Sequence, residues 1–250
     1  AAICAGRSDD DGFNALILNS SLAASQVNVL RAYGRYLRQL GLPFSQEYVE
    51  SCLVHHADIA VKLFELFEAR FDPAGPAGQG NLKPAEKICH EIEEMLEAVT
   101  SLDQDRILRN YLNAIEVTLR TNFYQRDAQG QRLNYLALKI SSGQVNEMPK
   151  PAPHVEVFVY APRVEGVHLR GGEVARGGLR WSDRQEDYRT EILGLVKAQM
   201  VKNAVIVPVG AKGGFIPRLL PENGDRDAIF AEGIEAYKIF ISALLELTDN

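Results

Sequence analysis

A single lysine among glycines is the part of this sequence best suited to chemistry. Lys212 lies in Pro208-Val-Gly-Ala-Lys-Gly-Gly-Phe215, after the apolar run 204–207. That run is typical of a buried strand, and the glycines allow the backbone to turn and to approach a ligand closely. A lysine near other cations and away from water loses its proton readily, which suits amine or carbonyl chemistry. Because no Ser or Thr follows Lys212, the segment does not match a phosphate-binding loop.

Two further polar groups precede this segment. Gln199 falls on the apolar stripe of a helix predicted over 186–200, and Lys202 follows three residues later. A buried amide without a partner costs about 1–3 kcal/mol, so Gln199 needs one. A ligand is one candidate for that partner. The alternative is that Gln199 bonds a backbone group while Lys202 extends to water.

Arginines gather just upstream of that helix. Arg176 precedes Gly177 and Gly178, and its planar guanidinium suits a carboxylate. The alternative is that these arginines are solvated and balance nearby acids. We favour that alternative for Arg180, Arg184 and Arg189. Trp181 is expected to pack in the core.

Charge is distributed unevenly along the chain. The net charge is −6, yet residues 161–218, here called the basic segment, hold ten Lys/Arg against six Asp/Glu. A basic segment in an acidic chain predicts a small anionic ligand rather than nucleic acid.

Composition indicates which broad classes of protein this chain can belong to. The 250 residues are 46% hydrophobic and 24% charged, as in ordinary globular proteins. No apolar run of membrane-spanning length and no signal peptide is evident, so no membrane association is expected. Three widely spaced cysteines argue against disulfides and zinc, and favour the cytoplasm.

The periodicity of apolar residues changes along the chain. Residues 1–130 predict a helical segment, with apolar stripes at Leu30–Leu40, Ile59–Phe67, Ile88–Val99 and Leu108–Leu119. Gly41 should end the first of these helices, and Ser101 with Gln104 should form a capping box. We interpret His55, His56 and His90 as ordinary helix residues, because no metal-ligand spacing appears.

Residues 131–250 predict an α/β domain. Alternating apolar residues indicate strands at 136–140 and 155–159, and a further strand is expected at 203–207. Helices are expected over 186–200 and 226–247. Strands interleaved with helices imply a mixed α/β fold.

The order of three motifs resembles the substrate-binding region of glutamate dehydrogenases. They are Arg-Gly-Gly-Leu-Arg-Trp at 176–181, Leu-Val-Lys-Ala-Gln-Met-Val-Lys-Asn-Ala at 195–204, and the lysine segment at 208–215. Residues 156–218 are similar to the large NAD-specific bacterial branch. The helical stretches 30–39 and 101–112 also resemble that branch.

The resemblance implies a role for each candidate residue. Lys212 occupies the position of the catalytic lysine, and Gln199 and Lys202 occupy positions that hold the substrate α-carboxylate. Arg176 would face the distal carboxylate, with the glycine pair 177–178 beside it. Many smaller members have lysine where this chain has Arg176.

The implied reaction is NAD-dependent oxidative deamination of L-glutamate to 2-oxoglutarate and ammonium, by an enzyme that is a homo-oligomer at full length. No Gly-x-Gly-x-x-Gly follows a predicted strand. We therefore expect the nucleotide-binding domain and the acidic catalytic partner to lie beyond Asn250, and this piece to be inactive alone.

Two alternatives stay open at this point. The basic segment could form a non-catalytic regulatory module that binds an anionic metabolite. Residues 25–120 could instead serve as a helical oligomerisation segment, which would not exclude the enzyme.

Overall fold

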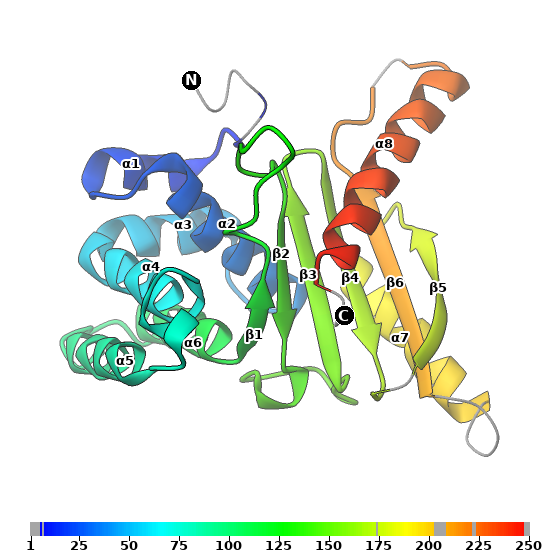
Figure 1. The fold of residues 1–250 in the computed structure, drawn as a ribbon. Coiled ribbons are helices and arrows are strands. Elements are labelled where there is room, and N and C mark those ends of the chain that lie inside the picture. The colour runs from blue at the N-terminus through cyan, green and yellow to red at the C-terminus, as the bar shows by residue number, and fades with distance from the viewer. Residues whose placement is uncertain (1–5, 7, 174, 203–208, 222–223, 248–250) are drawn as a thin grey trace. The chain divides into compact units, whose positions relative to one another are not determined.

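The computed structural model describes residues 6, 8–173, 175–202, 209–221 and 224–247. The chain forms two compact units that divide between Val117 and Thr118 (Figure 1). The boundary predicted at residue 130 therefore falls inside the second unit. The reason is that strand β1 follows the last helix of the first unit at once. Leu119, predicted for the buried face of that helix, lies in β1 and is exposed.

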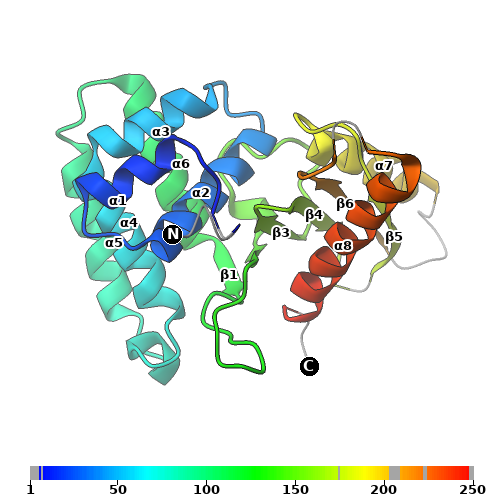
Figure 2. The same ribbon diagram turned by 90° about the horizontal axis from the view of Figure 1, so that it is seen from above.

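The first unit is helical, as predicted. Its helices pack against one another (Figure 2). The apolar side chains between them, such as Leu30, Leu63 and Ile107, are buried. The described elements are η1 (Gly12–Asn14), α1 (Ala15–Asn19), α2 (Ala24–Gln39), α3 (Gln46–His55), α4 (Ala57–Phe71), η2 (Pro76–Gln79), α5 (Lys83–Leu96) and α6 (Leu102–Glu116).

The helix boundaries confirm some local predictions and correct others. Helix α2 ends just before Gly41, whose φ of 93° suits a residue without a side chain. Ser101 accepts a hydrogen bond from the Gln104 backbone, but the Gln104 side chain contacts His56 Nε2 at 3.0 Å instead of closing a capping box. Helix α5 ends at Leu96, so Val99 is outside it.

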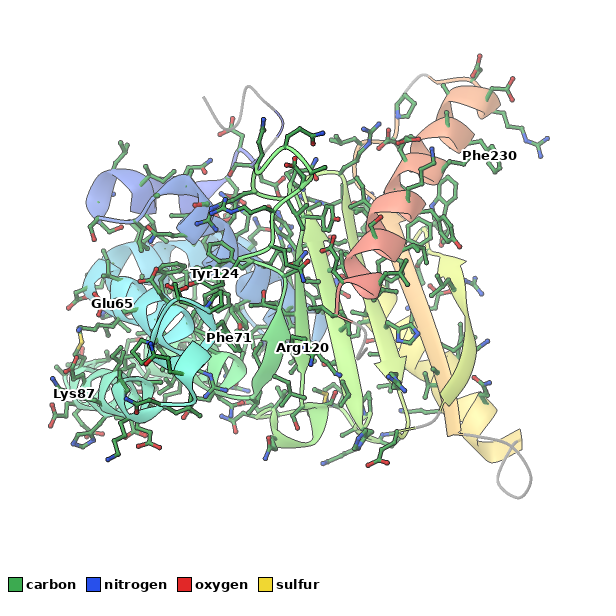
Figure 3. All side chains as sticks on the ribbon, in the orientation of Figure 1. Glu65, Phe71, Lys87, Arg120, Tyr124 and Phe230 are labelled. Atoms are coloured by element: carbon green, nitrogen blue, oxygen red, sulfur yellow. The ribbon has the colours of Figure 1, made fainter. Side chains whose placement is uncertain are left out.

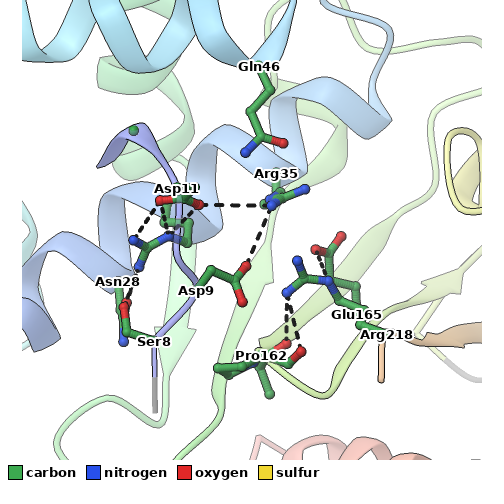
Figure 4. Close-up of polar contacts among 12 residues, drawn as sticks. Ser8, Asp9, Asp11, Asn28, Arg35, Gln46, Pro162, Glu165 and Arg218 are labelled. Atoms are coloured by element: carbon green, nitrogen blue, oxygen red, sulfur yellow. Dashed lines mark hydrogen bonds and ion pairs between the residues drawn. The ribbon is translucent and has the colours of Figure 1, made fainter. Parts of the chain in front are cut away.

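A buried arginine ties the start of this unit to α2. Arg31 is fully buried and its Nε and Nη2 lie 2.9 and 2.8 Å from the two carboxylate oxygens of Asp11. Arg35 pairs more loosely with Asp9, at 3.5 Å (Figure 4). Because a buried charge is costly without a partner, these cations are structural.

The second unit is built on a six-stranded sheet in the order β1-β2-β3-β4-β6-β5. All neighbouring strands are antiparallel except β5 and β6, which are parallel and connected through α7. The elements are β1 (Thr118–Thr121), β2 (Leu136–Ile140), η3 (Ser142–Gln144), β3 (Val155–Ala161), β4 (Val164–Arg170), β5 (Ala175–Trp181), α7 (Tyr188–Lys202), β6 (Val209–Pro217) and α8 (Arg226–Leu245).

This mixed sheet confirms the α/β prediction. Strands β2 and β3 and helices α7 and α8 lie where the sequence predicts them, whereas β1, β4 and β5 were not predicted. The strand expected at 203–207 lies outside the described residues. Helices α7 and α8 cover opposite faces of the sheet (Figure 1).

Aromatic side chains fill the space under α8. Phe215 stacks on Phe240 with ring centroids 5.6 Å apart, and Trp181 stacks on Phe215 at 6.4 Å. This confirms the packing role expected for Trp181. Phe230 lies on the outer side of the helix and is exposed (Figure 3).

None of the described helices is long and apolar enough to cross a membrane.

Candidate active site

Lys212 lies within a regular strand and not in a turn. Strand β6 pairs it with Leu169 of β4 on one side and with Gly178 of β5 on the other. The interpretation that the glycines let the backbone turn at this point is therefore wrong for residues 209–217, which form a regular strand. The glycines of this segment are explained by what lies above and below the sheet.

Successive residues of β6 face opposite helices. A side chain on Gly214 would meet Ile192 of α7, whereas Phe215 packs on Phe240 of α8. Because side chains alternate along a strand, Lys212 and Gly210 share the α7 face with Gly214. The lysine thus lies on the face opposite the aromatic core.

Gln199 is the residue of α7 that lies over the start of β6. A Cβ built on Gly210 would be 2.7 Å from Gln199 Oε1 and 2.8 Å from its Cδ. The amide is partly buried. The structure thus places the Gln199 side chain over Gly210, on the same face of β6 as Lys212 and two residues before it.

The two glycines of β5 have different surroundings. Gly178 is opposite Lys212, and among the described atoms a Cβ there would have Lys212 Nζ as its one neighbour within 4 Å, at 3.8 Å. It therefore leaves open space beside the amine. Gly177 is opposite Ala211, and a Cβ there would fall 1.4 Å from the Ala211 carbonyl oxygen. Close backbone approach explains Gly177, so the structure does not place it beside the lysine.

Only the backbones of Arg176 and Lys202 are described. Arg176 is in β5, in register with Gly210, and Lys202 is the last residue of α7. Both backbone positions are thus near Gln199 in the fold. Their side chains lie outside the described residues, and their contacts to a ligand stay predictions.

The surroundings of the Lys212 amine distinguish it from the other cations of the basic segment. The side chain is partly buried. Among the side chains that the structure describes, none forms an ion pair or hydrogen bond with Lys212. A partly desolvated cation without a protein partner is suited to an anionic or carbonyl ligand.

Most other cations of the basic segment already have carboxylate partners. Of the eight Lys/Arg of this segment whose side chains the structure describes, five form ion pairs: Arg163–Glu232, Arg180–Glu191, Arg184–Asp187, Arg189–Glu156 and Arg218–Glu165 (Figure 4 shows the last). Net charge alone therefore overstates the attraction of this segment for an anion. Position, and not charge count, distinguishes Lys212.

Arg189 corrects the expectation of a solvated arginine. It is fully buried, and its Nη2 lies 2.6 Å from Glu156 Oε2, also fully buried. The partner is in β3, far away in sequence, so no local pattern indicates it. Arg184 is exposed and pairs with Asp187, as its solvated interpretation requires. Arg180 is half exposed and pairs with Glu191 at 2.8 Å.

A histidine lies behind the site on the other face. His168 of β4 is in register with Gly213, on the α8 side. Burial, and to a smaller extent Arg170, lowers its pKa from the usual 6.5 to about 4. His168 is therefore neutral at neutral pH and adds no positive charge behind Lys212.

The described residues place an amide and an amine over the same face of β6, where a small polar molecule could be held. Gln199 offers an amide, Lys212 offers an amine, and Gly178 leaves room between the strand and the helix face. No group of three or more metal-binding side chains occurs in the described part of the chain. An amine beside an amide and a cleared space is suited to a carbonyl or imine substrate.

Two family models match this chain. The model of the bacterial NAD-glutamate dehydrogenase catalytic domain matches residues 91–250, and that of glutamate dehydrogenase helical motif 3 matches residues 8–73. The fold and the match over most of the chain define its class: this chain belongs to the bacterial NAD-glutamate dehydrogenase family.

Individual relatives carry the same name. The chain is 54% identical over 248 residues to an NAD-specific glutamate dehydrogenase of Halomonas elongata and 55% over 249 residues to one of Pseudomonas aeruginosa. These alignments cover 99% of this chain but 15% of each relative. A relative from Mycobacterium tuberculosis is 51% identical over 255 residues, covering 100% of this chain and 16% of the relative.

Proposed function

We propose that this chain supplies substrate-binding and catalytic residues for the NAD-dependent oxidative deamination of L-glutamate to 2-oxoglutarate and ammonium. The observation that supports this most is the Lys212 amine. It is partly buried, faces α7 beside the space left by Gly178, and has no partner among the described side chains. The family name supports the same reaction.

Substrate orientation falls to the groups around the lysine. Gln199 and Lys202 hold the α-carboxylate, and Arg176 holds the distal carboxylate through its planar guanidinium. The backbone register of Arg176 opposite Gly210 is compatible with this, because Gly210 is where Gln199 lies. Fixing both ends of a dicarboxylate would place its α-carbon next to Lys212.

Lys212 handles charge and protons at the reacting carbon. Its neutral amine accepts a proton from the water that attacks the iminium carbon of the oxidised substrate. The ammonium formed in this way stabilises negative charge on the oxygen as the carbonyl group forms. Both tasks need the amine close to the substrate and partly shielded from bulk water. The partly buried position on β6 meets the second condition.

A nicotinamide accepts the hydride in reactions of this kind. The sequence contains no Gly-x-Gly-x-x-Gly fingerprint, so the residues present do not fit a dinucleotide site. The roles proposed for this chain are therefore limited to binding, orientation and proton handling. We further propose that the 250 residues alone are inactive, and that the complete enzyme is cytoplasmic and homo-oligomeric.

The test is Lys212→Ala in the complete enzyme. Turnover of L-glutamate should fall by about 10²–10⁴-fold, the range typical of general acid–base catalysis. Circular dichroism and the midpoint of thermal unfolding should stay unchanged, because the described side chains form no bond with Lys212. Lys197→Ala, at an exposed position of α7, is the matched control.

Near-normal turnover of Lys212→Ala would contradict the proposal. If the variant kept its structure and its turnover but lost binding of a dicarboxylate outside the turnover cycle, the non-catalytic regulatory module would be favoured instead.

A further inference from the structure

The contact between Gly210 and Gln199 gives this glycine a role that the motif alone does not reveal. The three heavy atoms nearest to a Cβ built on Gly210 are Oε1, Cδ and Cγ of Gln199, at 2.7, 2.8 and 2.9 Å. Real Cβ atoms do not approach other atoms this closely. The Gln199 side chain therefore occupies the space that a side chain at position 210 would need.

Other glycines on the same face show that this contact is specific. A Cβ on Gly214 would instead meet the end of the Ile192 side chain, at 2.3 Å, which is ordinary apolar packing of α7. A Cβ on Gly178 would have Lys212 Nζ as its one neighbour within 4 Å among the described atoms. Gly214 thus allows the helix to pack, Gly178 is exposed beside the lysine, and Gly210 contacts an amide.

The location of the amide gives this contact its significance. Gly210 is two residues before Lys212 on the same strand face, and β5 places Arg176 in register with it. The Gln199 amide lies over Gly210, on the strand face that carries the lysine. A methyl group at position 210 would lift the amide away from this face.

We infer that Gly210 is a positioning residue for the substrate. Because it has no side chain, the Gln199 amide can lie against its backbone, on the face that carries Lys212. The inference rests on the proposed function, in which Gln199 holds the α-carboxylate. Gly210 acts only through Gln199 and does not touch the substrate.

A double-mutant cycle in the complete enzyme tests this. Gln199→Ala should raise the KM for L-glutamate about tenfold or more, as expected for loss of a hydrogen bond to a charged group, with a smaller change in kcat. Gly210→Ala should raise KM to a similar extent. In the Gln199→Ala background, Gly210→Ala should change KM less than about twofold, because the amide that it displaces is already absent. Gly214→Ala is the matched control and should lower thermal stability while leaving KM unchanged.

The outcomes separate the two ideas. If Gln199→Ala leaves KM unchanged, the proposed substrate contact of Gln199 fails, and the inference fails with it. If Gln199→Ala raises KM but Gly210→Ala does not, or if the two effects simply add, the positioning role of Gly210 is refuted. The proposed substrate contact of Gln199 then still stands. Should Gly210→Ala fail to fold, Gln199→Ala in the same chain must restore folding. A double variant that stays unfolded would overturn the inference, because the crowding would then lie elsewhere.

Discussion

The two faces of the sheet in the second unit are held to their helices by different forces. Under α8 the contacts are aromatic, with Phe215 between Trp181 and Phe240. Under α7 the contacts combine apolar residues with a fully buried ion pair, Arg189–Glu156.

The residues proposed for the chemistry lie on the second of these faces. The face under α8 is filled by stacked aromatic rings, whereas the α7 face carries Lys212, with the Gln199 amide over Gly210. Because strand residues alternate between faces, one nine-residue strand can serve both purposes. The difference teaches that β6 uses its odd positions from 211 to 215 for packing under α8, whereas the proposed site residues Gly210 and Lys212 alternate with them on the α7 face and Gly214 packs against Ile192.

Breaking the ion pair should have the largest effect on stability. Glu156→Ala leaves the Arg189 guanidinium buried without its carboxylate, which we expect to lower the free energy of unfolding by about 3–5 kcal/mol. Urea denaturation of the chain measures this. Asp187→Asn, which disrupts the exposed pair with Arg184, is the control and should cost less than about 1 kcal/mol. Equal losses in the two variants would show that α7 does not depend on the buried pair.

The α8 face should respond to pH through His168. Its pKa is about 4 in the folded chain and 6.5 when unfolded, so the unfolded chain binds the proton more tightly. Its contribution is complete above pH 6.5 and is lost as the pH falls from 6.5 towards 4, by up to about 3 kcal/mol at about 1.4 kcal/mol per pKa unit. The slope of unfolding free energy against pH in this window should flatten in His168→Gln. An unchanged slope would assign the pH dependence to other groups.

A conservative change in the aromatic core should have the smallest effect of the three. Phe240→Leu keeps an apolar side chain under α8 but removes the ring stacked on Phe215. Loss of an aromatic pair and of some volume should cost about 1–2 kcal/mol. Thermal unfolding checks the cost, and KM for L-glutamate in the complete enzyme should not change. A raised KM would mean that the two faces of β6 are not independent.

Prediction from sequence succeeded where the periodicity of a segment indicates the secondary structure of that same segment. The 3.6-residue period located α2, α4 and α6, and the two-residue period located β2 and β3. It failed at Lys212, where glycines suggested a turn. The spacing Gly210-x-Lys212-x-Gly214 is itself a two-residue period, and this signal could have indicated a strand.

Partners distant in sequence were also missed. Glu156 is 33 residues from Arg189, and nothing near either residue marks the pair. The charge count of the basic segment was correct, but its interpretation was incomplete. Among the cations whose side chains are described, five pair with carboxylates, two of which, Glu156 and Glu232, lie outside the segment.

The sequence by itself determined the helical and α/β parts of this chain, the order of motifs that places it in its family, and the lysine that we propose as the catalytic residue. These follow from periodicity and from short segments, which are local properties. Only the tertiary structure decided that Lys212 lies in a strand, that Gly210 lies under Gln199 while Gly178 leaves open space, and that Arg189 is buried. Each of these depends on which strand and helix meet, and such contacts arise from packing between residues far apart in the chain.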